Sequence, residues 1–274
     1  MITMCGNYIV GNKISSGTYS IVYNAINKRT KQHVAIKFSK KIENRSTLLN
    51  EARIMIHLRR SVPIPRIRDY GIYKNDINYL AMDLLGKPLY FENIHTNDMQ
   101  ETPSKHMNIK VLNISLQLFN IIKQLHDNGF IYRDIKPSNF LMGQPPNQSK
   151  IYLIDLGFVK HISNTICNNN TQKITPIGTI DYMSINTHNG YEQTKNDDLE
   201  SLAYLFYYMH NGSLPWSKLT EHSMIAKEKK ESDEFKRKCP TNVINYMKLV
   251  KDFERNEIPD YNMLYNTLSH VIIF

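Results

Sequence analysis

The segment at residues 132–139 places a carboxylate, an ammonium and an amide in one loop, and it constrains the chain more than any other feature. These groups belong to Asp134, Lys136 and Asn139, and a helical pattern ends at Gly129 just before them. In such a loop Asp134 can accept a hydrogen bond from a hydroxyl, and Lys136 can neutralise a phosphoryl group in transfer. Asn139 can offer its carbonyl oxygen to a magnesium ion. Residues that only cap a loop have no reason to fall in this order, so the segment indicates phosphoryl transfer.

A second acidic residue extends this set. Asp155 follows an apolar run at residues 151–154 and is itself followed by Leu156 and Gly157. A carboxylate at a strand end, before a glycine, can chelate a metal that bridges nucleotide phosphates. Magnesium takes one or two carboxylate or carbonyl ligands and completes its shell with phosphate oxygens and water. Asn139 and Asp155 therefore form a sufficient metal set.

Two features nearer the N-terminus fit the same chemistry but also have simpler explanations. The turn at residues 15–20 carries small side chains around Gly17, so its backbone amides can point at phosphate oxygens. It reads equally well as an ordinary hairpin turn. Lys37 closes an apolar strand pattern and Glu51 lies on the helical pattern that follows, so the two can pair. They can equally be an exposed strand end and a solvated helix residue.

The pattern of elements changes near residues 85–88, where Leu-Gly-Lys-Pro interrupts the chain. Short strand patterns and one helical pattern precede this break; they cover residues 8–14, 21–27, 33–38, 48–59 (the helix), 68–73 and 78–82. Long helical patterns follow it, at residues 109–128, 197–211 and 241–254. We therefore predict an α+β, two-lobed fold. A small, mostly β lobe with one helix covers residues 1–85, a larger, mostly α lobe covers residues 86–274, and together they form one domain.

Composition excludes several other classes of protein. The chain is 41% hydrophobic and 22% charged, and its longest apolar stretches are broken by polar residues, so we expect no membrane association. The net charge of +9 is spread along the chain without interleaved aromatic residues, so we expect no direct nucleic-acid binding. Three cysteines without paired spacing predict reduced thiols in the cytoplasm or nucleus, of a host cell if the chain is viral. No pattern specifies an oligomer, so we expect a monomer.

Several motifs together resemble a known family. Residues 34–37 (VAIK), 132–139 (YRDIKPSN) and 155–157 (DLG) resemble the protein-kinase signature set in its order. Residues 135–143, 178–188 (GTIDYMSINTH), 197–202 (DDLESL) and 212–216 (GSLPW) are similar to the casein kinase 1 family. The resemblance runs from about residue 8 to the C-terminus. It implies a two-lobed protein-kinase fold and transfer of the γ-phosphoryl of ATP, with Mg²⁺ or a substituting Mn²⁺, to Ser/Thr hydroxyls of protein substrates.

The resemblance also implies roles for particular residues. Lys37 would contact the α- and β-phosphates and pair with Glu51, and Asp134 would be the catalytic base or hydroxyl-orienting residue. Lys136 and Thr179 form the pattern of Ser/Thr specificity. Asp198 would support the catalytic loop, and His126 would be structural. By the same resemblance, the nucleotide would be bound by a phosphate loop, by residues around the adenine, by the gatekeeper Met82 and by a hinge that begins at Asp83. The other residues of this set are Ile14, Ser15, Gly17, Val22, Ala35, Leu85 and Leu141.

The chain departs from the family at four places. Ser15 and Ser20 stand where the family has Gly, which predicts a stiffer loop and weaker nucleotide binding. Tyr132 replaces His and Leu156 replaces Phe, and both changes keep a packing side chain. Asp181 stands where the family has Arg, so the family's preference for acidic or phosphorylated substrates is in doubt. The altered loop keeps one alternative open, a pseudokinase-type scaffold, whereas a small-molecule kinase on the same fold fits the motifs less well.

Overall fold

The computed structural model describes residues 4–40, 45–95, 109–162, 173–255 and 257–270 of the chain. Contacts divide the chain into two compact units, the first formed by Met1–Lys87 with Leu141–Gly157 and the second by Pro88–Phe140 with Phe158–Phe274. Among the described residues, the first unit is mostly β-strand with one α-helix and the second is mostly α-helical. The α+β class predicted from the sequence is confirmed.

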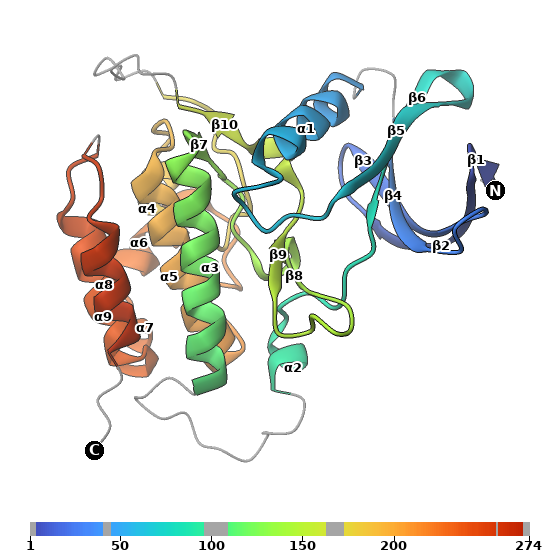
Figure 1. The fold of residues 1–274 in the computed structure, drawn as a ribbon. Helices are drawn as coiled ribbons and strands as arrows, with labels where there is room; N and C mark the ends of the chain where they lie inside the picture. Colours follow the sequence, from blue (N-terminus) through green and yellow to red (C-terminus); the bar gives the residue numbers. More distant parts are fainter. Residues whose placement is uncertain (1–3, 41–44, 96–108, 163–172, 256, 271–274) are drawn as a thin grey trace. The chain divides into compact units, whose positions relative to one another are not determined.

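The first unit is built on a six-stranded antiparallel sheet in the order β1-β2-β3-β4-β6-β5 (Figure 1). Its strands are β1 (Met4–Cys5), β2 (Tyr8–Ser16), β3 (Ser20–Asn27), β4 (His33–Ser39), β5 (Ile67–Tyr73) and β6 (Ile77–Asp83). The five longer strands lie where the alternating patterns predict them, since those patterns are rich in β-branched and aromatic residues.

The two faces of this sheet carry different side chains, because successive residues of a strand point to opposite sides. Val34, Ile36 and Phe38 of β4 belong to a buried apolar cluster on one face, together with residues of β2, β3 and β6. Ala35 and Lys37 alternate with them and therefore project to the other face. One strand thus supplies both the core of the unit and the residues predicted to meet a nucleotide.

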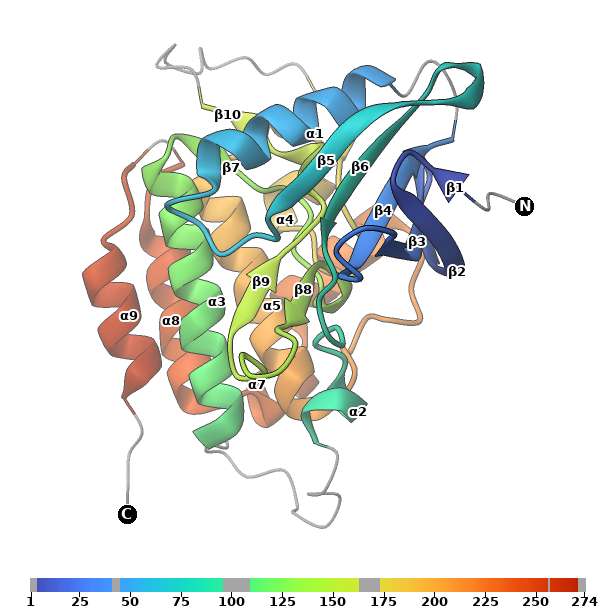
Figure 2. The same cartoon turned by 45° about the vertical axis from the view of Figure 1, so that its right-hand side comes forward.

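A helix and a small hairpin complete the first unit. Helix α1 (Arg45–Leu58) packs against β5 and β6 (Figure 2). Strands β8 (Phe140–Met142) and β9 (Ile151–Leu153) pair with each other. They are tied into the unit by hydrogen bonds from Met142 N to Lys87 O (2.9 Å) and from Leu153 N to Pro63 O (2.8 Å). The sequence predicted one boundary between the lobes, at residue 85, and this boundary stays a prediction. The first unit defined by contacts also contains the β8–β9 hairpin, which comes later in the chain.

The second unit is a bundle in which α3 packs against α5 and α9, while α8 packs against both of these helices (Figure 1). Its described helices are α2 (Phe91–Ile94), α3 (Ile109–Asp127), α4 (Ile185–His188), α5 (Lys195–Asn211), α6 (His222–Glu231), α7 (Asp233–Lys238), α8 (Thr241–Asp252) and α9 (Tyr261–Ser269). Strands β7 (Phe130–Ile131) and β10 (Lys160–His161) form a short antiparallel pair. The predicted helices correspond to α3, α5 and α8, whereas α2, α4, α6, α7 and α9, which are shorter, were not predicted. None of the described helices is both long and apolar enough to cross a lipid bilayer.

Helix α5 has clear signals at both ends. Thr194 and Asp197 form a capping box at its N-terminus, where each side chain accepts from the other residue's backbone N–H. Gly212 ends the helix in the left-handed region with φ 83°, a conformation that glycine adopts without strain. These caps fix the start of the helix, and therefore fix where Asp198 in its first turn is held.

Candidate active site

In the first unit, Lys37, Glu51 and Asp155 form a compact charged cluster. Lys37 Nζ donates to both carboxylate oxygens of Glu51 at 2.8 and 2.7 Å and to Asp155 Oδ1 at 2.9 Å. Lys37 and Glu51 are 7% and 2% exposed, so the alternatives of a solvated strand end and a solvated helix residue are wrong. The cluster joins β4, α1 and the segment after β9, which lie far apart in the sequence.

The electrostatics of this cluster keep a positive charge on Lys37. Burial acts to lower the pKa of Lys37, but the carboxylates of Glu51 and Asp155 outweigh it and raise that pKa. Burial raises the pKa of Glu51, and the adjacent ammonium opposes the rise. Leu156 N donates to Glu51 Oε1 at 3.3 Å, and Asp155 has a φ of 58°, a strained value for a non-glycine residue. Asp155 is thus held with one oxygen on Lys37.

The predicted nucleotide residues of the sheet share the face of Lys37. Val22 pairs directly with Lys37, and Ala35 pairs with Met82 one step along the ladder. Directly paired residues project to the same side, so these side chains line one surface. The structure therefore brings the predicted adenine contacts Val22 and Ala35 together with the gatekeeper Met82 and the cation.

The remaining predicted nucleotide residues lie on other elements of the first unit. Ile14 lies in β2 and is 51% exposed, and Leu141 lies in β8. Asp83 ends β6, where Arg68 Nε donates to its Oδ1 at 2.5 Å. The carbonyl of Leu85 accepts from the side-chain amide of Gln144 at 2.9 Å, so this oxygen of the predicted hinge already has a partner within the unit.

The predicted phosphate loop is a tight turn between β2 and β3. Gly17 N donates to Ser20 O at 3.0 Å, and Ser15 pairs with Val22 at the base of the turn. A Cβ added at Gly17 would meet no atom within 4 Å, so this glycine is not required by packing in the structure. Open space around Gly17 fits a backbone that a phosphate approaches, although a plain hairpin turn would show the same feature.

In the second unit, Asp134 is the centre of a cluster of donors. Its Oδ1 accepts from Thr179 Oγ1 at 2.7 Å, and its Oδ2 contacts Lys136 Nζ at 2.8 Å and accepts from Asn139 Nδ2 at 3.0 Å. Asp134 is only 3% exposed. Four residues predicted from the sequence therefore meet at one carboxylate. An approaching hydroxyl could hydrogen-bond to that carboxylate while the Lys136 ammonium lies beside it.

The orientation of Asn139 agrees with a role as a metal ligand. Its Nδ2 donates to the backbone carbonyl of Asp134 at 2.9 Å and to that residue's carboxylate, which leaves Oδ1 as the oxygen available for coordination. No group of three or more His, Cys, Asp or Glu side chains that could hold a metal occurs in the described parts of the chain. An amide oxygen of this kind is a ligand that Mg²⁺ takes beside phosphate oxygens and water.

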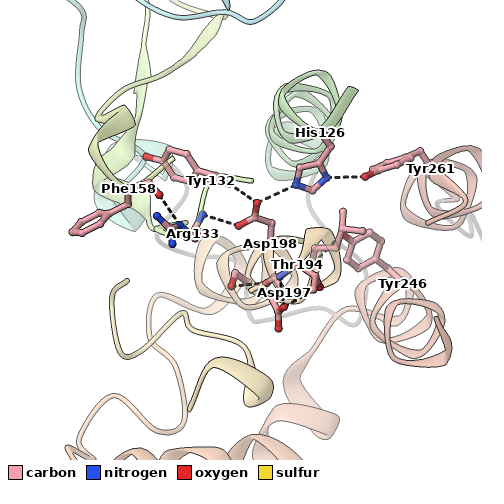
Figure 3. A network of polar contacts seen from close by, with 11 residues as sticks. His126, Tyr132, Arg133, Phe158, Thr194, Asp197, Asp198, Tyr246 and Tyr261 are labelled. Carbon is pink, nitrogen blue, oxygen red and sulfur yellow. Dashed lines mark hydrogen bonds and ion pairs between the residues drawn. The ribbon is translucent and has the colours of Figure 1, made fainter. Parts of the chain in front are cut away.

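Asp198 holds the catalytic loop through its backbone (Figure 3). Its Oδ2 accepts from Tyr132 N at 2.6 Å and its Oδ1 from Arg133 N at 2.9 Å. Arg133 has a φ of 72°, and its Nε donates to Phe158 O at 2.7 Å. A bulky residue in the left-handed region is strained, so the buried carboxylate stabilises a conformation that this loop would otherwise leave.

His126 completes this network in the way its predicted structural role requires. Its Nε2 lies 3.0 Å from Asp198 Oδ2, and its Nδ1 lies 2.7 Å from the hydroxyl of Tyr261 (Figure 3). A neutral ring that carries its proton on Nε2 satisfies both contacts, donating to the carboxylate and accepting from the hydroxyl. Tyr261 was not singled out from the sequence, because it lies 135 residues from His126 along the chain.

Gly178 explains how Thr179 reaches Asp134. Gly178 has a φ of 122°, and a Cβ at this position would lie 2.5 Å from the backbone oxygen of Arg133. Only glycine fits this close approach of two backbones. The glycine of the segment at residues 178–188 is therefore required by contact with the catalytic loop.

The sequence of the chain was compared with family models and with known proteins. A family model described as the protein kinase domain matches residues 8–259. The chain belongs to the protein kinase family. The kinase domain is 32% identical over 280 residues to casein kinase I homolog 2 of Schizosaccharomyces pombe, across 97% of this chain and 62% of that protein. It is 32% identical over 269 residues to casein kinase I homolog RAG8 of Kluyveromyces lactis, across 93% of this chain and 49% of that protein.

The chain spans about half to three fifths of the length of the curated relatives it matches. The casein kinase 1 resemblance drawn from the motifs and the two-lobed kinase fold class are confirmed. Protein kinases as a family use ATP and a divalent metal. The roles of individual residues in this kinase domain stay predictions.

The kinase domain also contains a buried lysine that the sequence did not identify. Lys229 of α6 is 5% exposed, and its Nζ donates to Met183 O at 2.6 Å and lies 3.0 Å from His188 Nε2. The ammonium also lies over the rings of Tyr204 and Trp216, at 4.6 and 5.1 Å from their centroids. It thereby ties the segment at residues 178–188 to α5 and α6.

The buried position of Lys229 predicts a pH-dependent stability. Burial lowers the pKa of Lys229 to about 7, against the opposing charges of Glu200 and Asp181. Between that value and the unfolded value of 10.5 the unfolded chain binds more protons, so the free energy of unfolding rises with pH. From pH 7 to 9 we expect wild type to gain about 2 kcal/mol relative to Lys229→Met, measured by urea unfolding. Parallel pH curves for the two proteins would contradict the lowered pKa of Lys229.

Proposed function

We propose that this kinase domain is an active Ser/Thr protein kinase that transfers the γ-phosphoryl of Mg-ATP to hydroxyls of protein substrates. The observation that carries the proposal is the Asp134 carboxylate, which is buried and contacts Lys136, Asn139 and Thr179 together. A loop with a purely structural role does not require that an ammonium, an amide and a hydroxyl all contact one carboxylate.

Each group has a role that follows from its chemistry. Asp134 orients the substrate hydroxyl for in-line attack and accepts its proton, and Lys136 neutralises charge on the transferring phosphoryl group. Thr179 holds the second carboxylate oxygen of Asp134, which fixes the direction of the first. Lys37, positioned by Glu51, contacts the α- and β-phosphates, because its ammonium remains charged when buried.

Asn139 and Asp155 would hold Mg²⁺, with Mn²⁺ as a substitute, and the ion would neutralise negative charge on the phosphates. The side chain of each residue is held by a hydrogen bond of its own. Asn139 Nδ2 donates to the backbone oxygen of Asp134, and Asp155 Oδ1 accepts from Lys37 Nζ. We further propose a monomer that acts in the cytoplasm or nucleus and binds no nucleic acid directly.

A pseudokinase-type scaffold is the alternative, and the charged cluster of the first unit argues against it. A scaffold gains nothing from the buried contacts of Lys37 with Glu51 and Asp155, because a buried ion pair is often no more stabilising than apolar residues of the same volume. The retention of all three charges is explained by phosphoryl transfer.

The test is transfer of labelled γ-phosphate to casein and to a basic protein, by wild type and by Asp134→Asn. The variant keeps the shape of the side chain but cannot accept the proton, so we expect the rate to fall by about 10²- to 10⁴-fold. Incorporation by wild type no greater than by Asp134→Asn would reject the enzyme and favour the scaffold.

Asp181 predicts which substrates are preferred. Its carboxyl is half-buried, burial raises its pKa, and the nearby Lys229 opposes that shift. We expect peptides with basic residues near the acceptor to be phosphorylated about threefold to tenfold faster than acidic or phosphorylated ones at low salt. A peptide-library profile measures this preference, and Asp181→Arg should shift it toward acidic peptides. A strong acidic preference in wild type would contradict the assignment.

A further inference from the structure

Lys229 is a buried cation to which the proposed transfer chemistry gives no role. Its side chain lies in the interior of the second unit, and no carboxylate of the residues that the structure describes is within ion-pair distance of its ammonium. The charges of Asp181 and Glu200 act on it without a direct hydrogen bond. Taking an ammonium out of water without a counter-ion is costly, and an apolar side chain of similar length would fill the same space. Packing alone therefore does not account for a lysine at this position.

The ammonium contacts the tight turn that begins at Thr179. Within this turn, Tyr182 N and Met183 N both donate to Thr179 O, at 2.9 and 3.1 Å. The carbonyl of Met183 in turn accepts from Lys229 Nζ at 2.6 Å. At the start of the turn, Thr179 Oγ1 donates to Asp134 Oδ1 at 2.7 Å. Three hydrogen bonds in series thus connect Lys229 with the carboxylate proposed to orient the substrate hydroxyl.

Two other anchors of the segment lie on either side of the Met183 carbonyl. Before it, the indole of Trp216 donates to the backbone oxygen two residues earlier, at 2.8 Å. After it, the hydroxyl of Ser184 donates to a carboxylate of α5 at 2.5 Å. Lys229 holds the carbonyl between these two anchors. Without this contact the turn is free to relax between them, and Thr179 moves with it because Met183 N donates to its carbonyl.

The ammonium itself is held in one place. It lies over the rings of Tyr204 and Trp216, and 3.0 Å from His188 Nε2. Because an ammonium can only donate, this nitrogen accepts, and the proton of the neutral ring lies on Nδ1, 2.9 Å from His222 Nδ1. Burial and the charge of Lys229 lower the pKa of His188 to about 3, which keeps the ring neutral. A donor fixed in this way can fix its acceptor.

We propose that Lys229 is a positioning residue for phosphoryl transfer, which holds the turn so that Thr179 reaches Asp134. This role rests on the proposed function, because it concerns the same site. Loss of the ammonium releases the Met183 carbonyl, the Thr179 hydroxyl shifts, and one oxygen of Asp134 loses its fixed partner. A displacement of about 1 Å, caused by a substitution far from the chemistry, can lower a rate by about 10²-fold.

The test is a double-mutant cycle with Lys229→Met and Thr179→Val, measured on the whole chain by transfer of labelled γ-phosphate to casein and to a basic protein. We expect each single substitution to lower kcat by about tenfold or more, while KM for ATP changes by less than about twofold. Because Lys229 acts through Thr179, adding Lys229→Met to Thr179→Val should lower kcat by less than about a further twofold. The matched control is Lys227→Met, an exposed lysine of the same helix, which should leave kcat within about twofold of wild type.

A lysine with only a structural role gives a different pattern, because its loss would add to the effect of Thr179→Val. Multiplicative losses in the double variant, or an unchanged kcat for Lys229→Met, would overturn this role and leave the proposed function intact. No transfer by wild type above the Asp134→Asn background would overturn the proposed function and this role together. If thermal unfolding shows Lys229→Met to be misfolded, Lys229→Gln replaces it, since its amide keeps the site polar but ends one bond short of the ammonium.

Discussion

Replacing Lys37 with Met is expected to lower phosphoryl transfer by at least about 10²-fold, because the variant loses the cation proposed to contact the nucleotide phosphates. A loss of this size is typical when one pre-positioned donor of charge stabilisation is removed. Steady-state transfer from labelled ATP measures the effect. An unchanged rate would contradict the role given to Lys37.

The same substitution is also expected to destabilise the first unit. Glu51 is 2% exposed and would lose the ammonium that contacts both of its oxygens, and breaking a buried pair costs about 3–5 kcal/mol. Burial raises the pKa of Glu51 above its ordinary 4.5 and the Lys37 ammonium opposes this rise, so the variant raises that pKa further and its penalty grows as the pH rises above 4.5. Urea unfolding at pH 5 and pH 7 should therefore show a larger deficit at pH 7.

A double variant separates the two effects. Lys37→Met/Glu51→Gln removes the uncompensated charge, so we expect most of the lost stability to return while phosphoryl transfer stays absent. Lys40→Met, an exposed lysine just beyond the same strand, is the matched control and should leave both rate and stability nearly unchanged. If the double variant regained activity along with stability, Lys37 would have only a structural role.

Replacing Asp198 with Asn is expected to cost about 3–5 kcal/mol of unfolding free energy and most of the activity of the molecules that still fold. An amide keeps one acceptor oxygen, but its NH₂ would face a backbone N–H of the catalytic loop. Without both acceptors, Arg133 has less support for its φ of 72°, and Asp134 moves with it. Chemical denaturation and transfer assays on the same preparation measure both effects.

Two further variants show whether the effect comes from the loop contacts. Tyr261→Phe removes only the hydroxyl beside His126 and should cost about 1 kcal/mol with little loss of rate. Asp127→Asn removes a half-exposed carboxylate that pairs with Lys123 and should cost at most about 0.5 kcal/mol. If Asp198→Asn were no more damaging than Asp127→Asn, the supporting role of Asp198 would be excluded.

Much of the fold followed from local patterns. The alternation in residues 33–38 predicts a strand with two different faces, and the structure places Val34 in the core and Lys37 on the opposite side. The helical pattern that begins near Asp197 and stops before Gly212 corresponds to α5, with its cap at each end. These predictions succeed because period and capping depend on neighbouring residues.

The short helices α6 and α9 were missed for the converse reason. Their positions are set by what they pack against, such as α9 against α3 and α8, and a nine-residue helix carries little periodic signal of its own. The buried Lys229 on α6 was missed as well, because an ammonium beneath two aromatic rings cannot be told from a solvated lysine in the sequence.

The sequence by itself determined the family and the order of the catalytic groups in the segment at residues 132–139, because those groups lie within one loop and their spacing is local. Only the tertiary structure decided how they are held. It shows Asp198 fixing the loop backbone, Gly178 admitting Thr179 to Asp134, and the Lys37 ammonium buried against two carboxylates. Such contacts join residues tens of positions apart, and their strength depends on burial, which a linear sequence does not contain.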